Sequence, residues 1–349
     1  MTKEVKHLYI HIPFCKHICS YCDFVRKVPS CMCEVNDYLN KLNQNIINEC
    51  KNLKFKTIYI GGGTPNSLND TQLTFLLSTL TKYLDKDYEF TIECNPEFIT
   101  QSQVNIFKKY KVNRISLGVQ TRNKEILNDF NRKHTNLQVD KAIKLFQKNK
   151  LTNISVDFIY GYRKMTNKDI DDDIKLLLDY HIPHVSFYSL ELKPGSTLTK
   201  QKYQLDEELI DKQFAYIINK LKSNHYIRYE ISNWCLNDKY RSQHNLAYWQ
   251  TKQWKALGYG AYGFENMCYY HFDKNKKITH KYSWKEYYQH ILIMGLRLLE
   301  GLDLTNPDFK KAWNYFKNKI DSKLYSIKNN HVIIKNINTL DEVLINIIY

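Results

Sequence analysis

The sequence predicts an α/β protein built on a partial (β/α)6 barrel of TIM type, followed by an α+β extension and a small winged-helix-like module. Short β-branched or aromatic runs alternate with longer segments of helical period, which is typical of repeated βα units with parallel strands. Each run is also followed by chemically unusual residues. Because active sites of parallel barrels gather at the carboxyl ends of the strands, we expect the functional site there.

The barrel is predicted from six strand segments and the helical segments between them. The strands are expected at Leu8–His11, Thr57–Ile60, Glu89–Glu93, Arg114–Leu117, Ile154–Phe158 and His184–Tyr188. The first helix is expected to bury one face made of Leu39, Leu42, Ile46, Ile47 and Cys50. A second helix is predicted after Asn69, with Gln72 as its capping partner and apolar positions running to Leu84.

The pattern changes after Gly195. The expected elements are a helix over Asp206–Ser223, an aromatic-rich stretch from Tyr226 to Tyr270, and a helix over Ser283–Glu300 ended by Gly301. The tail reads as a helix, a strand pair that includes His331–Lys335, and a last helix from Leu340. We therefore predict three regions: a barrel over 1–200, an extension over 201–300 and the winged-helix-like module over 301–349.

Composition narrows the class of protein. The chain has 349 residues, a formal net charge of +15 and a mean hydropathy of -0.53. No long uncharged apolar run and no signal peptide are visible, so a cytoplasmic location is expected, while peripheral membrane association stays open. The lysines are scattered, which argues against nucleic acid as the partner. A basic protein still favours acidic ligands, such as a porphyrin bearing carboxylates.

Three cysteines form the first candidate site. Cys15, Cys19 and Cys22 have the spacing C-x3-C-x2-C, and soft thiolates select zinc, copper(I) or iron–sulfur clusters. Three ligands on a four-iron cube would leave one iron open. The alternative is a zinc site completed by one further residue, drawn from His11, His17, Cys31 or Cys33. The other four cysteines, Cys50, Cys94, Cys235 and Cys268, are assigned to packing, and in a cytoplasmic protein we expect cysteines to be metal ligands or buried thiols rather than disulfides.

Polar residues at strand ends form the second candidate site. Gly61-Gly-Gly-Thr-Pro65 would let the backbone approach a ligand closely, because glycine has no Cβ. Glu93, Gln120, Arg132 and Asp157 offer acceptors for an amine and for ribose hydroxyls, plus a cation for a carboxylate. This mixture suits a zwitterionic nucleoside.

The run His244-Asn-Leu-Ala-Tyr-Trp249 is the third candidate. If it is helical, Asn245, Tyr248 and Trp249 share a face. Imidazole is an axial heme ligand and aromatic rings can line a porphyrin, so a heme site is one interpretation. A structural helix start with a hydrogen-bonded histidine is the other, and residue types alone favour it.

Taken together, these motifs resemble the radical S-adenosylmethionine (SAM) proteins of the oxygen-independent coproporphyrinogen oxidase group. The segments that carry the resemblance are Tyr9–Cys22, Gly61–Pro65, Glu93–Pro96, Ser116–Gln120, Ser155–Asp157, Tyr188–Leu190, Tyr229–Asn233, His244–Trp249 and Glu300–Leu304. Within the group the chain looks like the HemW heme-chaperone branch. Phe24 stands where the oxidase carries another cysteine, little precedes Tyr9, and the H-N-x-x-Y-W motif is intact.

The resemblance implies specific cofactors and contacts. By it, Cys15, Cys19 and Cys22 hold a [4Fe-4S] cluster whose open iron is chelated by SAM. The implied SAM contacts are Tyr9, Gly63, Glu93, Gln120, Arg132 and Asp157, with Tyr21 and Thr64 near a second SAM. The implied heme-binding residues are His244, Asn245, Tyr248 and Trp249.

The resemblance favours a heme chaperone that delivers heme to acceptor proteins over a coproporphyrinogen III dehydrogenase. The alternative function is an oxygen-independent coproporphyrinogen III oxidase, or a relative that modifies its acceptor by radical SAM chemistry. A third hypothesis is a zinc-stabilised binding module without iron. The acceptor protein, the number of bound SAM molecules and the oligomeric state do not follow from the sequence.

Overall fold

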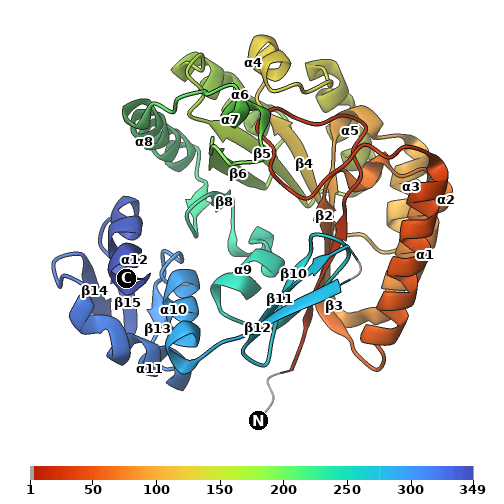
Figure 1. The fold of residues 1–349 in the computed structure, drawn as a ribbon. Coiled ribbons are helices and arrows are strands. Elements are labelled where there is room, and N and C mark those ends of the chain that lie inside the picture. The colour runs from red at the N-terminus through yellow and green to blue at the C-terminus, as the bar shows by residue number, and fades with distance from the viewer. Residues whose placement is uncertain (1–3, 275, 349) are drawn as a thin grey trace.

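A single twelve-stranded sheet organises the first four-fifths of the chain (Figure 1). The computed structural model describes residues 4–274 and 276–348. Six neighbouring strands run parallel: β1 (His7–Ile12), β2 (Phe55–Gly62), β3 (Leu84–Cys94), β4 (Arg114–Gln120), β5 (Ile154–Tyr160) and β6 (His184–Ser189). These strands include all six predicted segments, and the predicted partial barrel is confirmed.

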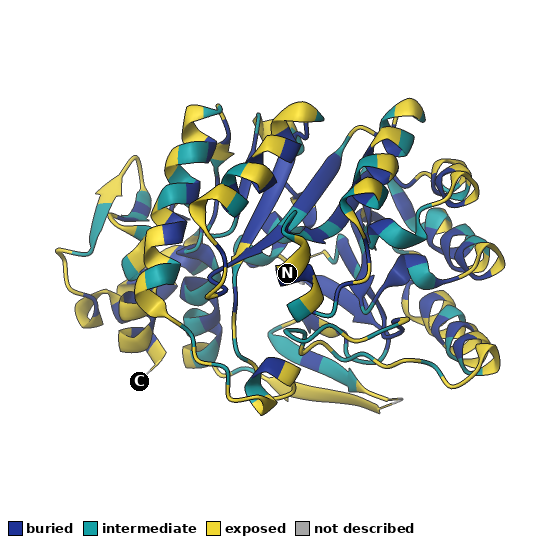
Figure 2. Ribbon diagram, turned by 90° about the horizontal axis from the view of Figure 1, so that it is seen from above, coloured by how far each residue is buried: buried dark blue, intermediate teal, exposed yellow. Residues whose placement is uncertain are grey.

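Helices cover the outer face of this sheet, and Figure 2 shows them exposed outward and buried toward the strands. They are α1 (Met32–Glu49), α2 (Asp70–Leu80), α3 (Gln101–Lys109), α4 (Lys124–Asp129), α5 (Asn136–Lys148), α6 (Asn167–Asp179) and α8 (Glu207–Ser223). The short α7 (Thr197–Lys200) lies instead against the loop after β1, where Leu198 N–H donates to Ser20 O at 3.0 Å. Strands covered in this way are buried on both faces, which explains their nearly continuous apolar sequences. In β1, for example, Leu8, Ile10 and Ile12 are fully buried.

Three helix predictions need correction. Ile47 is 44% exposed, because it lies one position beyond Ile46 and turns away from the buried face of α1. The helix after Asn69 has the predicted capping box with Gln72, but it ends at Leu80, and Leu84 begins β3 instead. The helix predicted over Ser283–Glu300 ends at Gly295, so α10 covers Trp284–Gly295.

The sheet continues past both edges of the parallel strands. On one side β9 (Trp254–Leu257) pairs parallel with β1 and is followed by antiparallel β10 (Tyr262–Glu265), β11 (Cys268–Asp273) and β12 (Lys276–Lys281). On the other side β8 (Asn233–Cys235) pairs antiparallel with β6, and β7 (Ile227–Arg228) forms the edge. Among the described residues β7 and β12 do not pair, so the sheet remains open.

The C-terminal segment forms a module beside the sheet, drawn in blue in Figure 1, with helix α9 (Gln243–Trp249) between the module and the strands. After α10 it contains β13 (Leu302–Asp303), α11 (Pro307–Phe316), β14 (Tyr325–Lys328), β15 (His331–Ile334) and α12 (Leu340–Ile348). The structure thus has the predicted helix, strand pair and final helix. A second apolar core runs from Trp254 to Ile347 and draws on both the extension and this module, while the boundaries at 200 and 300 stay a prediction.

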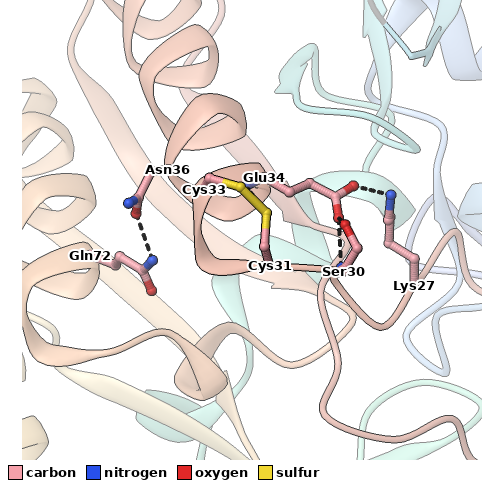
Figure 3. The surroundings of a disulfide bond; sticks show 7 residues. All are labelled: Lys27, Ser30, Cys31, Cys33, Glu34, Asn36 and Gln72. Carbon is pink, nitrogen blue, oxygen red and sulfur yellow. Dashed lines mark hydrogen bonds and ion pairs between the residues drawn. A yellow bond between two sulfur atoms is a disulfide. The ribbon is translucent and has the colours of Figure 1, made fainter.

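Cys31 and Cys33 form a disulfide, with their Cα atoms 5.3 Å apart (Figure 3). The expectation of metal ligands or buried thiols was therefore wrong for these two, whose Cα separation falls in the normal range for such a bond. Cys31 is also the N-cap of α1, where its Sγ accepts the backbone N–H of Glu34 at 3.3 Å. The remaining seven cysteines are free thiols, and Cys50, Cys94 and Cys235 are buried as expected for packing.

Candidate functional site

A cavity of about 390 Å³ opens at the carboxyl ends of β1–β6, and we call it the rim cavity. The predicted residues that line it are Cys15, Cys19, Tyr21, Cys22, Gly63, Thr64, Glu93, Gln120, Arg132 and Asp157. These residues come from five different strand ends, as the barrel prediction required. The structure therefore brings the three cysteines and most of the predicted nucleoside contacts into one space.

The cysteine loop after β1 is fixed by backbone hydrogen bonds. Cys15 N–H donates to Lys27 O at 2.9 Å and Lys27 N–H donates to Pro13 O at 2.7 Å, which closes the loop at its base. Ser20 N–H donates to Phe130 O at 2.9 Å, which attaches the middle of the loop to the segment after α4. The thiols are therefore held by the fold itself, before any metal binds.

Positive charge and burial set the state of the three thiols. Burial raises the pKa of Cys15, and it raises that of Cys22 to about 11. Burial also opposes ionisation of Cys19, but a hydrogen bond from His17 and the charge of Arg132 outweigh it and lower the pKa of Cys19. The guanidinium of Arg132 reaches Cys19 Sγ at 3.7 Å. Cys19 is thus the thiol most prepared to become a thiolate.

The three free thiols can be compared with both metal hypotheses. In the described part of the chain, no three His, Cys, Asp or Glu side chains are close enough together to hold a single metal ion. With Cys31 and Cys33 joined to each other, two of the four candidates for completing a zinc site are also occupied. A four-iron cube needs a different geometry, because each of its thiolates binds a separate iron. Three free thiols around one cavity fit that group.

The glycine run at the end of β2 lies so close to other site residues that a side chain there would clash with them. A Cβ at Gly61 would lie 2.8 Å from the carboxylate of Glu93. A Cβ at Gly63 would lie 2.7 Å from Phe14 O and 2.9 Å from Cys15 Sγ. The prediction that these glycines admit a ligand is untested, but the structure shows that they admit the protein's own site residues.

Glu93 has an unusual environment for a carboxylate. It accepts the hydroxyl of Tyr59 at 2.8 Å and the backbone N–H of Gly62 at 3.1 Å. Burial raises its pKa to about 7, and these two hydrogen bonds only partly oppose that increase. A carboxyl group with this pKa can hold or release a proton near neutral pH, and a cationic ligand in the rim cavity would favour its ionised form.

Gln120 and Arg132 are placed by an irregularity at the end of β4. Gln120 has φ of +67°, in the left-handed region, and the pairing of β4 with β5 shifts register between Gly118 and Gln120. Such a bulge re-aims a side chain next to a site. Arg132 donates to Gly118 O at 2.6 Å and to Asn95 Oδ1 at 3.1 Å, so its guanidinium joins β3, β4 and the cysteine loop.

Asp157 lies on β5, inside the barrel, with hydroxyl partners. Ser116 Oγ donates to its Oδ2 at 2.6 Å, and Ser155 Oγ donates to its Oδ1 at 3.3 Å. Burial raises the pKa of Asp157, and these hydroxyls oppose the shift. The acceptor capacity left over faces the rim cavity.

The residues predicted to bind heme do not line the rim cavity. His244 is 1% exposed, with its Nδ1 hydrogen-bonded to Thr57 Oγ1 at 2.7 Å and its Nε2 to Tyr248 OH at 2.7 Å. Burial lowers the pKa of His244 well below its usual range, so the ring is neutral. Both ring nitrogens are therefore occupied, and ligation of iron would require the ring to leave one partner. Its role in heme binding stays a prediction.

Tyr9 also lies outside the lining of the rim cavity. Its hydroxyl is hydrogen-bonded to His11 Nδ1 at 3.1 Å, and its ring stacks on Tyr59 with centroids 6.1 Å apart. Tyr59 in turn stacks on His244 at 5.1 Å and lines the rim cavity. As the structure stands, Tyr9 supports Tyr59, and a direct contact with SAM stays a prediction.

Sequence reasoning missed three residues that organise the interior. Tyr59 holds Glu93, Thr57 holds His244, and Glu89 accepts the backbone N–H groups of Gln243 and His244 at 2.9 and 3.0 Å. Thr57 and Tyr59 share the side of β2 that carries Gly61, because side chains alternate along a strand. That alternation could have identified both. Nothing in the sequence indicates the long-range contact of Glu89 with the start of α9.

Comparisons with known proteins cover most of the chain. A model of the radical SAM superfamily matches residues 9–177. The heme chaperone HemW of Lactococcus lactis is 35% identical over 76% of this chain and 71% of its own length, and that of Bacillus subtilis is 34% identical over 74% and 71%. The solved coproporphyrinogen III oxidase of Escherichia coli has the same fold, with a TM-score of 0.83 at 19% identity, over 99% of this chain and 90% of that structure.

Proposed function

Because the chain belongs to the HemW heme-chaperone family of the radical SAM superfamily, we propose that it binds a [4Fe-4S] cluster, SAM and heme, and delivers heme to acceptor proteins. The observation that carries this proposal is the rim cavity, where three free thiols meet buried carboxylates, an amide and a guanidinium. A zinc module would not need that second set of groups.

Cys15, Cys19 and Cys22 would hold three of the cluster's four irons. When bound, the cluster supplies one open coordination position and one electron. The chain's own contribution is to stabilise the negative sulfurs. Thr64 Oγ1 donates to Cys15 Sγ at 3.5 Å, and the guanidinium of Arg132 lies against Cys19.

The groups around SAM would be Glu93, Gln120 and Asp157. SAM carries an ammonium, a sulfonium and ribose hydroxyls, all of which favour acceptor oxygens in a buried site. Glu93 and Asp157 offer such oxygens, and their present donors, Tyr59 and Ser116, fix their orientation. Tyr21 packs edge-on against Phe130 at 5.1 Å and closes the cavity beside the cysteine loop.

The proposal is tested by anaerobic reconstitution of the full chain with iron and sulfide. We expect about four irons and four sulfides per protein with a broad visible absorbance. The triple substitution Cys15→Ala, Cys19→Ala and Cys22→Ala should abolish both. Cys268→Ala removes a free thiol that does not line the cavity and serves as the matched control.

Heme delivery is tested with the same protein. Heme-loaded protein should transfer heme to an apo-heme acceptor, which is followed by the change in heme absorbance. Oxidation of coproporphyrinogen III with SAM and a reductant, without stable heme binding, would instead support the oxidase. Colourless protein containing one zinc and no iron would overturn the proposal in favour of the zinc module.

A further inference from the structure

A second cavity lies at the opposite end of the parallel strands, and we call it the basal cavity. Its volume is about 560 Å³, within the roughly 300–1,000 Å³ of small-molecule sites. It is bounded by the starts of β1 and β2, the segment between α9 and β9, and the C-terminal module from Gly295 to Phe309. None of the cysteines and strand-end residues of the rim cavity contributes to it.

Two lysines at this cavity lack a direct acidic partner among the described residues. They are Lys56 and Lys252. Partial desolvation and then the charge of Lys56 lower the pKa of Lys252, as expected for two cations sharing one space. The lining also holds three carboxylates. Glu300 pairs with Arg241 at 3.1 Å, Glu4 pairs with Lys6, and Asp303 accepts the hydroxyl of Thr305 and keeps its negative charge.

The rest of the lining includes a group of apolar side chains. Leu298, Leu302 and Phe309 are all less than a tenth exposed, and they face the cavity beside the indole of Trp249. The Trp249 Nε1 and Thr251 Oγ1 atoms are buried without a hydrogen-bond partner within residues 4–274 and 276–348. Apolar walls with a few unpaired polar groups are typical of a ligand site.

One imidazole of the lining has a free nitrogen. His331, at the start of β15, has its Nδ1 2.9 Å from Asn329 O. A carbonyl oxygen only accepts, so Nδ1 carries a proton, and Nε2 is the nitrogen left for another partner. A hydrogen bond that orients the ring through its other nitrogen is typical of histidines that bind metals. His244, in comparison, has both nitrogens engaged.

We propose that the basal cavity is the heme site, with Lys56 and Lys252 pairing with the propionates, Trp249 and Phe309 covering the macrocycle, and His331 Nε2 binding the iron. This inference rests on the proposed function, since it takes heme as the ligand, and it assigns the ligand to residues outside the H-N-x-x-Y-W histidine. The site recognises a flat apolar dicarboxylate with a central metal.

Heme titration of the full-length protein, followed by its Soret absorbance, tests the lysines. The double variant Lys56→Glu, Lys252→Glu should bind heme at least about 30-fold more weakly, because attraction at two carboxylates becomes repulsion. The variant Lys141→Glu, Lys148→Glu makes the same charge change on exposed positions of α5 and should bind as the wild type does.

A second pair of variants tests the iron ligand. His331→Ala should shift the Soret maximum and weaken heme binding about tenfold, whereas His225→Ala, an exposed histidine elsewhere, should do neither. Iron-free protoporphyrin IX has the same carboxylates without the metal. Its affinity should depend on the two lysines and be insensitive to His331→Ala.

The outcomes separate the two proposals. If wild-type protein binds heme and the lysine and His331 variants match their controls, the basal site is wrong and the proposed function stands. If wild-type protein binds neither heme nor the iron-free porphyrin, the heme part of the proposed function and the basal site both fail. Lysine dependence without any effect of His331→Ala would retain the cavity and overturn the iron ligand.

Discussion

The two ends of one parallel sheet differ in how their cavities are built. At the rim, the polar groups lie at the ends of strands or in the segments that follow them, and many of them belong to the sequence motifs. At the base, the lining comes from segments more than three hundred residues apart, and most of it belongs to no motif. The comparison teaches that barrel topology allows the residues of the rim cavity to be predicted from the sequence. The lining of the basal cavity depends instead on how the C-terminal module packs against the sheet.

The largest expected effect separates the two ends completely. Replacing Cys15, Cys19 and Cys22 with alanine should remove all bound iron and sulfide. Because none of the three lines the basal cavity, heme affinity should stay within about twofold of the wild type. Iron analysis and heme titration on the same preparation check both. A parallel loss of heme affinity would show that the ends are not independent.

His244 belongs to neither cavity lining, and its replacement should act mainly on stability. His244→Ala removes the partner of the Tyr248 hydroxyl and one of the two partners of the Thr57 hydroxyl, and it should lower the free energy of unfolding by about 3 kcal/mol. Urea denaturation measures this, with His271→Ala as the control for loss of a less buried ring. A normal unfolding curve combined with an altered heme spectrum would instead make His244 an iron ligand.

A residue of the rim cavity, Glu93, should make the stability of the protein depend on pH. Burial raises the pKa of Glu93 to about 7 in the folded protein, so between its unfolded value and 7 the folded state binds more protons than the unfolded state. Relative to Glu93→Gln, the apo-protein should therefore lose stability, on the order of 2 kcal/mol, as pH rises from about 5 to about 8. Urea denaturation of both proteins across this range measures it, and a constant difference would contradict it.

The smallest effect is expected at the disulfide in Figure 3, which lines neither cavity. Replacing Cys31 and Cys33 with serine should lower the free energy of unfolding by only about 1 kcal/mol, since the bond closes a very short loop and serine keeps a cap for α1. Iron content should be unchanged. Loss of metal in this variant would revive the zinc hypothesis.

The sequence predicted the strands and the rim because local signals agree there. The structure contains the predicted capping pair of Asn69 and Gln72 and the predicted strand β5, and both depend on residues close together in the sequence. The three closely spaced cysteines likewise line one cavity. Leu84 shows the limit. It continues the helical period of α2, but pairing of β3 beside β2 outweighs that preference.

The rest depends on contacts that no local pattern contains. Glu89 meets the start of α9 across more than 150 positions of sequence, and His244 meets Thr57 across nearly 190. The disulfide was missed because compartment, not geometry, guided that expectation. Long-range packing also brings Lys56 and Lys252 to the same cavity, and no local pattern in the sequence indicates this.

A row of hydrogen bonds leads from the basal cavity into the barrel interior. His7, in the lining of the basal cavity, has its Nδ1 2.9 Å from Thr57 Oγ1, which continues to His244 and Tyr248. Each imidazole and hydroxyl in the row can donate or accept a hydrogen bond, so the bonds of the whole row can point in either of two directions. A ligand that hydrogen-bonds to the other ring nitrogen of His7 selects one direction. The hydroxyl hydrogen of Tyr248, at the far end of the row, then takes the orientation set by that direction. Binding in the basal cavity would thus change a hydrogen-bond donor inside the barrel without direct contact.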